Sequence, residues 1–351
     1  WGSVAVIGAA AGPTVGGFFL EHFWWGSVFL LNVPLVAVAI ALTLLLAPPN
    51  APNPQKHWDF PSSLYSLITL ACLVLAIKSL ANNWPVCAAA GVVFACGALA
   101  FARRQARLSD PLLTFDIFRS RIFSGGALTA GGAMFCLAGL ELLSTQKLQL
   151  VDALSPLNAG LIISAMALSA IPTSILGGAT LHHVGFLPLI SGGFLFMAAG
   201  MALVVWTGGT MLPVLVCGLV LTGLGAGLAM SVSSTAIINA APPHRAGMAS
   251  GVEAVSYEFG TLISIALTGS LVPLLMAREL PPHLSELGTD ALHHHSSHAA
   301  ATSAYNAGYL FTIGGLSCFA LLFAAITAWC FRDNPKSGDP HACLLYTSDA
   351  A

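Results

Sequence analysis

The sequence predicts an all-α membrane protein with about ten membrane-spanning helices. The first observation is composition: 56% of the 351 residues are hydrophobic, only 7% are charged, and the mean hydropathy is +0.84. Soluble globular proteins carry about a quarter charged residues, so this chain cannot cover itself with a solvated surface. The second observation is that apolar stretches recur along the whole chain, each with about the 20 residues that a helix needs to cross the hydrocarbon core.

Ten stretches meet this length requirement. In chain order they are 1–20, 24–47, 62–80, 85–102, 122–145, 158–181, 186–206, 211–236, 250–276 and 304–330. Proline, glycine and asparagine, which favour turns, interrupt the apolar pattern between many of them. These breaks are Pro48-Pro49-Asn50, Asn82-Asn83-Trp84-Pro85, Ser155-Pro156, Gly208-Gly209 and Pro242-Pro243.

The distribution of lysine and arginine predicts the orientation of these spans, because loops on the cytoplasmic side of a membrane are enriched in both. If the loop 48–61 is cytoplasmic, alternate loops place nine basic residues on its side: Lys56, Arg103, Arg104, Arg107, Arg119, Arg121, Arg245, Arg332 and Lys336. Three basic residues fall on the other side: Lys78, Lys147 and Arg278. We therefore expect a cytoplasmic C-terminus and an external loop 277–303.

Several classes of function lack the residues that they need. A formal net charge of −2 provides no basic field for phosphate, so no nucleic-acid partner is expected. The eight cysteines form no CxxC pair, and the histidine-rich loop 293–298 has no cysteine and few acids, so no metal site is predicted. The sequence contains no HExxH, GxSxG or GxxxxGK motif. We expect neither an enzyme nor a cofactor.

The first apolar stretch carries small residues in a helical pattern. Gly8, Gly12 and Gly16 are spaced by four residues and share one helix face, which lets a second helix approach closely. Pro13 removes a backbone donor and bends the helix. By the same reasoning, a later group of glycines is predicted to serve helix packing: Gly218, Gly223, Gly225 and Gly227.

These residues resemble a known family. Residues 12–17 (Gly-Pro-Thr-Val-Gly-Gly) are similar to the antiporter motif on the fifth helix of major facilitator superfamily drug:proton antiporters. The run from Trp25 to Pro34, which includes Asn32, resembles the start of helix six in the fourteen-helix branch. Segments 139–156 and 251–260 resemble the methyl viologen resistance subgroup of that branch. The resemblance covers about residues 1–335, and Gly12, Pro13, Gly16 and Gly17 carry its most specific part.

The resemblance implies a domain organisation in which the chain holds helices five to fourteen. Residues 1–47 would end the N-terminal six-helix half, 62–102 would be two inserted helices, and 122–335 would form the C-terminal half. Helices one to four would be absent. The last residues, 343–351, resemble a translated sequencing adapter and are interpreted as a non-native tail. The Asp-Arg pair that the family places before Gly185 is missing, which argues against a charge-relay gate in that loop.

Three acids within the spans are candidates for coupling to protons. Ionisable side chains inside a membrane are costly and usually functional, and a carboxylate in apolar surroundings binds a proton at higher pH than in water. Glu258 is the first candidate, Glu253 the second and Glu141 the third. Glu253 and Glu258 are five residues apart and point about 140° away from each other on a helix. The alternative for both is a structural acid bonded to a neighbouring helix, and for Glu141 it is snorkelling to the interface.

The resemblance implies proton-coupled efflux of lipophilic or quaternary cations, such as viologens, disinfectants and dyes, by alternating access. The partners would be the cationic substrate, protons and the lipid bilayer. We expect a multi-pass monomer in the bacterial inner membrane, without nucleic acid. A facilitator or importer of a small metabolite on the same fold is the alternative.

Overall fold

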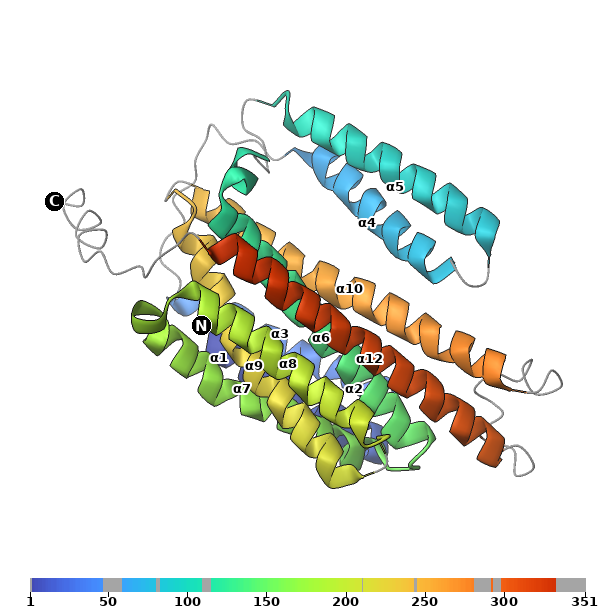
Figure 1. The fold of residues 1–351 in the computed structure, drawn as a ribbon. Coiled ribbons are helices and arrows are strands. Elements are labelled where there is room, and N and C mark those ends of the chain that lie inside the picture. Colours follow the sequence, from blue (N-terminus) through green and yellow to red (C-terminus); the bar gives the residue numbers. More distant parts are fainter. Residues whose placement is uncertain are drawn as a thin grey trace.

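The computed structural model describes residues 2–46, 59–79, 83–108, 115–209, 211–242, 245–280, 292 and 298–332, and all of its regular elements are helices (Figure 1). The chain begins with α1 (Gly2–His22), α2 (Ser27–Leu30), α3 (Asn32–Leu46), α4 (Phe60–Ser79), α5 (Trp84–Gln105) and a short 3₁₀ helix, η1 (Phe115–Arg119). It continues with α6 (Arg121–Leu150), α7 (Pro156–Val184), α8 (Phe186–Trp206), α9 (Leu212–Asn239), α10 (Ala246–Glu279) and α12 (His298–Phe331).

The predicted all-α membrane fold is confirmed. Within the described ranges, nine segments are long and apolar enough to cross a membrane, with α2 and α3 together forming one of them, Ser27–Leu46. The tenth predicted stretch, 1–20, is occupied by α1.

Helix ends differ from the predicted ones because capping residues, rather than the limits of the apolar run, set them. The side chain of Ser155 accepts a hydrogen bond from the backbone N–H of Asn158, so α7 begins two residues earlier than predicted. At its other end, α6 continues past the predicted residue 145 through polar residues to Leu150.

The core lies among α6, α7, α8, α9, α10 and α12, and the other helices attach to this bundle. α1 packs along α7, whereas α4 and α5 form a hairpin that lies beside α10 (Figure 1). α3 buries none of its side chains against the described residues. The part that resembles a C-terminal half is therefore the packed core of this chain.

Close backbone contacts hold α9 between its neighbours. A β-carbon on Gly193 of α8 would lie 2.7 Å from the carbonyl oxygen of Gly225, and one on Gly200 would lie 2.5 Å from that of Gly218. On the α7 side, β-carbons on Gly223 and Gly227 would overlap backbone carbonyl oxygens. The prediction that Gly218, Gly223, Gly225 and Gly227 serve helix packing is confirmed.

Two adjacent glycines of α8 provide a matched test of this packing. We expect Gly193→Ala to destabilise the fold by about 1–3 kcal/mol, because the added methyl group meets a backbone oxygen that cannot rotate away. Gly192→Ala should be neutral or stabilising by up to about 1 kcal/mol, since nothing lies within 4 Å of its β-carbon position. Melting temperatures in detergent would compare the two; equal melting temperatures would contradict the close crossing.

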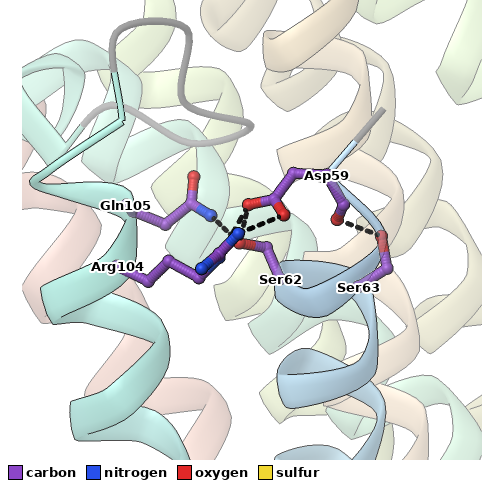
Figure 2. A network of polar contacts seen from close by, with 5 residues as sticks. All are labelled: Asp59, Ser62, Ser63, Arg104 and Gln105. Atoms are coloured by element: carbon purple, nitrogen blue, oxygen red, sulfur yellow. Dashed lines mark hydrogen bonds and ion pairs between the residues drawn. The ribbon is translucent and has the colours of Figure 1, made fainter. Parts of the chain in front are cut away.

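A polar cluster fastens the end of α5 to the start of α4 (Figure 2). The Arg104 guanidinium donates from Nη2 to Asp59 Oδ1 at 2.7 Å and from Nε to Oδ2 at 2.9 Å. Ser62 also donates to Asp59, and the buried Gln105 side chain donates to the Ser62 hydroxyl at 2.8 Å. The hydrogen bond from Arg104, followed by that from Ser62, lowers the pKa of Asp59 from 3.8 to about 2.

The lowered pKa of Asp59 predicts that the stability of the α4–α5 hairpin depends on pH. Because the pKa of Asp59 is lower in the folded state, its stabilising contribution is complete above about pH 3.8 and is lost as the pH falls towards about 2. The difference in melting temperature between the wild type and Asp59→Asn should therefore shrink across this window. A difference that stays constant across this window would contradict the prediction.

Further contacts gather basic residues at one end of the bundle. Arg245, just before α10, pairs with Asp116 of η1 at 2.9 Å, and Arg121 at the start of α6 lies 5.1 Å from the ring centroid of Trp329 near the end of α12. Figure 1 shows the corresponding ends of α5, α6, α10 and α12 at the same end of the molecule. At the other end of α6, the buried Lys147 pairs with Asp152 at 2.8 Å.

Candidate functional site

The antiporter motif, residues 12–17, forms the contact between α1 and α7. A β-carbon on Gly17 would lie 2.5 Å from the carbonyl oxygen of Pro156, and one on Gly160 would overlap the carbonyl oxygen of Pro13. The two helices therefore touch backbone to backbone, which only glycine permits at these positions. The sequence alone did not predict a role for Gly160, because that role depends on a helix about 150 residues away in the chain.

Gly12 and Gly16 have the opposite surroundings. Apart from the adjoining backbone of α1, no atom of the described residues lies within 4 Å of a β-carbon placed on either glycine. Both residues line a cavity of about 430 Å³ between α1, α6 and α7. The other lining residues are Pro13, Gly17 and Leu20 of α1, Glu141, Thr145 and Gln149 of α6, and Pro156 and Gly160 of α7. The motif thus combines a tight helix contact with an open wall.

Among the residues that the structure describes, Glu141 is the only ionisable one that lines this cavity. It is half-buried, and the structure gives it no hydrogen bond or ion pair with any residue in the described ranges. Thr145 and Gln149 follow at four-residue spacing on the same face of α6. The sequence prediction missed these two side chains, although their spacing from Glu141 could have indicated them. Together they offer one carboxylate, one hydroxyl and one amide to a small molecule.

The two acids of α10 lie elsewhere. Glu253 is half-buried, and its Oε1 accepts a hydrogen bond from the Tyr257 hydroxyl at 3.2 Å. Tyr257 packs against the cluster that contains Ile237 and Phe123. Glu258 is exposed on another face of α10, as expected for residues about 140° apart. The structure therefore separates Glu141, which shares a cavity with the antiporter motif, from Glu253 and Glu258, which do not.

The two residues of the helix-six motif mark a helix start. Asn32 is the first residue of α3 and Pro34 lies in its first turn, where a missing backbone N–H costs no hydrogen bond. Both side chains are exposed. The structure thus places them at the start of α3, which Leu31 separates from the short α2.

No group of three or more metal-binding side chains occurs among the residues that the structure describes. His293, His294 and His295 lie outside those residues. His298 is described, and its Nδ1 lies 2.8 Å from the carbonyl oxygen of Leu292.

Comparison with known proteins supports the resemblance seen in the sequence. A sequence model of the Major Facilitator Superfamily matches residues 1–264. Methyl viologen resistance protein SmvA of Salmonella typhimurium is 32% identical over 276 residues, which cover 78% of this chain and 56% of the relative. Multidrug efflux pump LfrA of Mycolicibacterium smegmatis is 33% identical over 279 residues, covering 77% and 54%. Multidrug resistance protein Stp of Mycobacterium tuberculosis is 27% identical over 298 residues, covering 84% and 56%. The chain spans about half the length of these curated relatives.

Proposed function

The chain belongs to the Major Facilitator Superfamily, a family of transporters rather than enzymes, and on this premise we propose that it is part of a proton-coupled exporter of lipophilic or quaternary cations. The observation that carries this proposal is the cavity shared by Glu141 and the antiporter motif. A lone carboxylate in an otherwise uncharged cavity can bind either a proton or an organic cation. Methyl viologen is a dicationic compound. Related proteins that are named for multidrug efflux and for resistance to methyl viologen support the same class of substrate.

In the proposed cycle, Glu141 exchanges its two partners. When the cavity opens outward, a proton neutralises the carboxylate and the cation leaves. When it opens inward, the proton leaves and a new cation binds. Because one carboxylate cannot hold both partners, the downhill entry of a proton drives the export of the cation. Thr145 and Gln149 would orient the cation through polar contacts.

The structure favours Glu141 over the two acids of α10 for this role. Glu253 already has a hydrogen-bonding partner in Tyr257, and Glu258 does not line the cavity that contains the antiporter motif. Both residues remain candidates for proton transfer at another stage of the cycle. Gly12 and Gly16 would leave room for the substrate, and Gly17 would close the contact with α7.

We also propose the domain organisation and orientation that follow from the family. Residues 1–47 end the N-terminal half, 62–102 are the inserted hairpin and 122–335 form the C-terminal half of a monomer in the bacterial inner membrane. The end of the bundle that carries Arg103, Arg121 and Arg245 faces the cytoplasm, as does the C-terminus.

An efflux assay tests the proposed function. Cells that express the full natural reading frame encoding this chain should expel ethidium and methyl viologen faster than cells that lack it. Collapse of the proton gradient should abolish the difference. Accumulation that expression leaves unchanged, or efflux that survives loss of the gradient, would contradict a proton-driven exporter, and gradient-independent uptake would favour a facilitator.

A further inference from the structure

A second and larger cavity lies between the α4–α5 hairpin and the first half of α10. It has a volume of about 810 Å³, within the range of small-molecule sites. Side chains of α4, α5, η1 and α10 line it, and the aromatic ones are Phe94, Phe101, Phe118 and Phe259. Figure 1 shows the hairpin running beside α10. This cavity shares no lining residue with the one that contains Glu141.

The wall of this cavity is apolar apart from a few hydroxyl groups. None of the lining residues is charged. An organic cation would therefore meet no carboxylate there, unlike in the cavity that contains Glu141. The mostly apolar wall offers water few of the polar partners that it needs. The interior suits an aliphatic chain.

The end of this cavity is positively charged. Arg103 directly follows the lining residue Ala102, Arg119 directly follows the lining residue Phe118, and Arg107 lies in the turn after α5. All three side chains are exposed, and none has an acidic partner within the described part of the chain.

Neighbouring arginines are already engaged. Arg104 is held by Asp59 in the cluster of Figure 2, and Arg245 by Asp116. Three guanidinium groups therefore remain at the end of the cavity to meet an anion. Guanidinium groups bind phosphate oxygens in pairs of parallel hydrogen bonds, and basic pockets between membrane helices bind anionic headgroups.

We propose that this cavity is a binding site for an anionic phospholipid. One acyl chain occupies the space between α4, α5 and α10, and the phosphate lies against Arg103, Arg107 and Arg119. A zwitterionic lipid carries a cation that these arginines would repel, so the site selects by headgroup charge. The site is independent of the proposed transport function, because it shares neither its cavity nor its charged residue.

A lipid-binding assay tests this proposal. Phosphatidylglycerol with a fluorescent label on its acyl chain is added to the purified protein in detergent, and its binding is followed by fluorescence anisotropy. Unlabelled phosphatidylglycerol should displace the labelled lipid at about tenfold lower concentration than phosphatidylcholine. The triple variant Arg103→Gln, Arg107→Gln and Arg119→Gln should lose most of this preference, because each basic residue near an anionic surface contributes about 1 kcal/mol, or roughly fivefold in affinity. The double variant Lys78→Gln and Arg278→Gln removes basic charge at the other end of the bundle. It should leave the preference for phosphatidylglycerol over phosphatidylcholine unchanged.

A second pair of variants tests the apolar part of the site. Gly251 lines the cavity and has no atom within 4 Å of its β-carbon position, so Gly251→Leu should fill the space without a clash and weaken lipid binding about tenfold. Gly91→Leu is the matched control, since Gly91 is equally open but does not line the cavity. Val255→Phe provides an independent filling variant.

Three results would overturn the proposal. Unchanged binding by Gly251→Leu and Val255→Phe, with both variants folded as judged by size-exclusion chromatography, would show that the lipid does not enter the cavity. Equal displacement by phosphatidylglycerol and phosphatidylcholine in the wild type would show a nonspecific lipid contact. Displacement of the labelled lipid by ethidium but not by phosphatidylglycerol would assign the cavity to the cationic substrate instead.

Discussion

Replacement of Glu141 by glutamine should reduce gradient-driven efflux of ethidium to the background of cells that lack the transporter. The amide has nearly the shape of the carboxylic acid, but it neither binds a proton near neutral pH nor attracts a cation. No other ionisable side chain from the described part of the chain lines the cavity with the antiporter motif, so none of these neighbours can replace Glu141. Glu141→Asp keeps the charge and should retain part of the activity.

The measurement is the initial rate of ethidium efflux from energised cells, normalised to the amount of protein in the membrane. Glu279→Gln, which removes an exposed acid at the end of α10, serves as the matched control and should transport like the wild type. Glu253→Gln and Glu258→Gln belong in the same series. Full activity of Glu141→Gln together with loss of activity in Glu258→Gln would move the coupling role to α10.

The variant Gly160→Val should loosen α1 from the rest of the bundle. A β-carbon at this position overlaps the carbonyl oxygen of Pro13, so the two backbones must separate. Overpacking of this kind costs about 1–3 kcal/mol, and it also changes the shape of the cavity that Gly160 lines. We expect a lower melting temperature in detergent and a loss of efflux.

Gly192→Val is the control for this variant. It introduces the same β-branched residue into a helix, with the same small change in helix propensity, but at a position where, apart from the adjoining backbone of α8, no other described residue lies within 4 Å of the β-carbon. Its melting temperature should stay close to that of the wild type. If both variants lose the same stability, a general effect of valine in these helices, rather than the contact between α1 and α7, explains the loss.

The positions of the helices could be predicted from the sequence, because the thickness of the hydrocarbon core sets the number of apolar residues that a spanning helix needs. It could not predict their ends, since hydrogen bonds such as that from Asn158 to Ser155 set them and apolar content does not. The separation of Glu253 and Glu258 onto two faces of α10 follows from helix geometry alone, and the structure agrees with it.

The composition of the candidate site was only partly predictable. Glu141 stood out as an acid in an apolar run, and residues 12–17 stood out as a motif. Nothing in their spacing indicated that they share a cavity, because about 125 residues and several helices separate them in the chain. The importance of Gly160 also depends on which helix lies opposite, which is a property of the tertiary fold.

The crossings of α8 and α9 at Gly193, Gly200, Gly218 and Gly225 have a consequence for spectroscopy. Where two helices touch through backbone atoms, a change of side-chain rotamer cannot relieve the contact, and the close packing resists sliding of one helix past the other. Spin labels placed on the outer faces of these two helices should therefore keep one distance through the whole transport cycle. Such a pair would serve as an internal reference for distances measured between other helices.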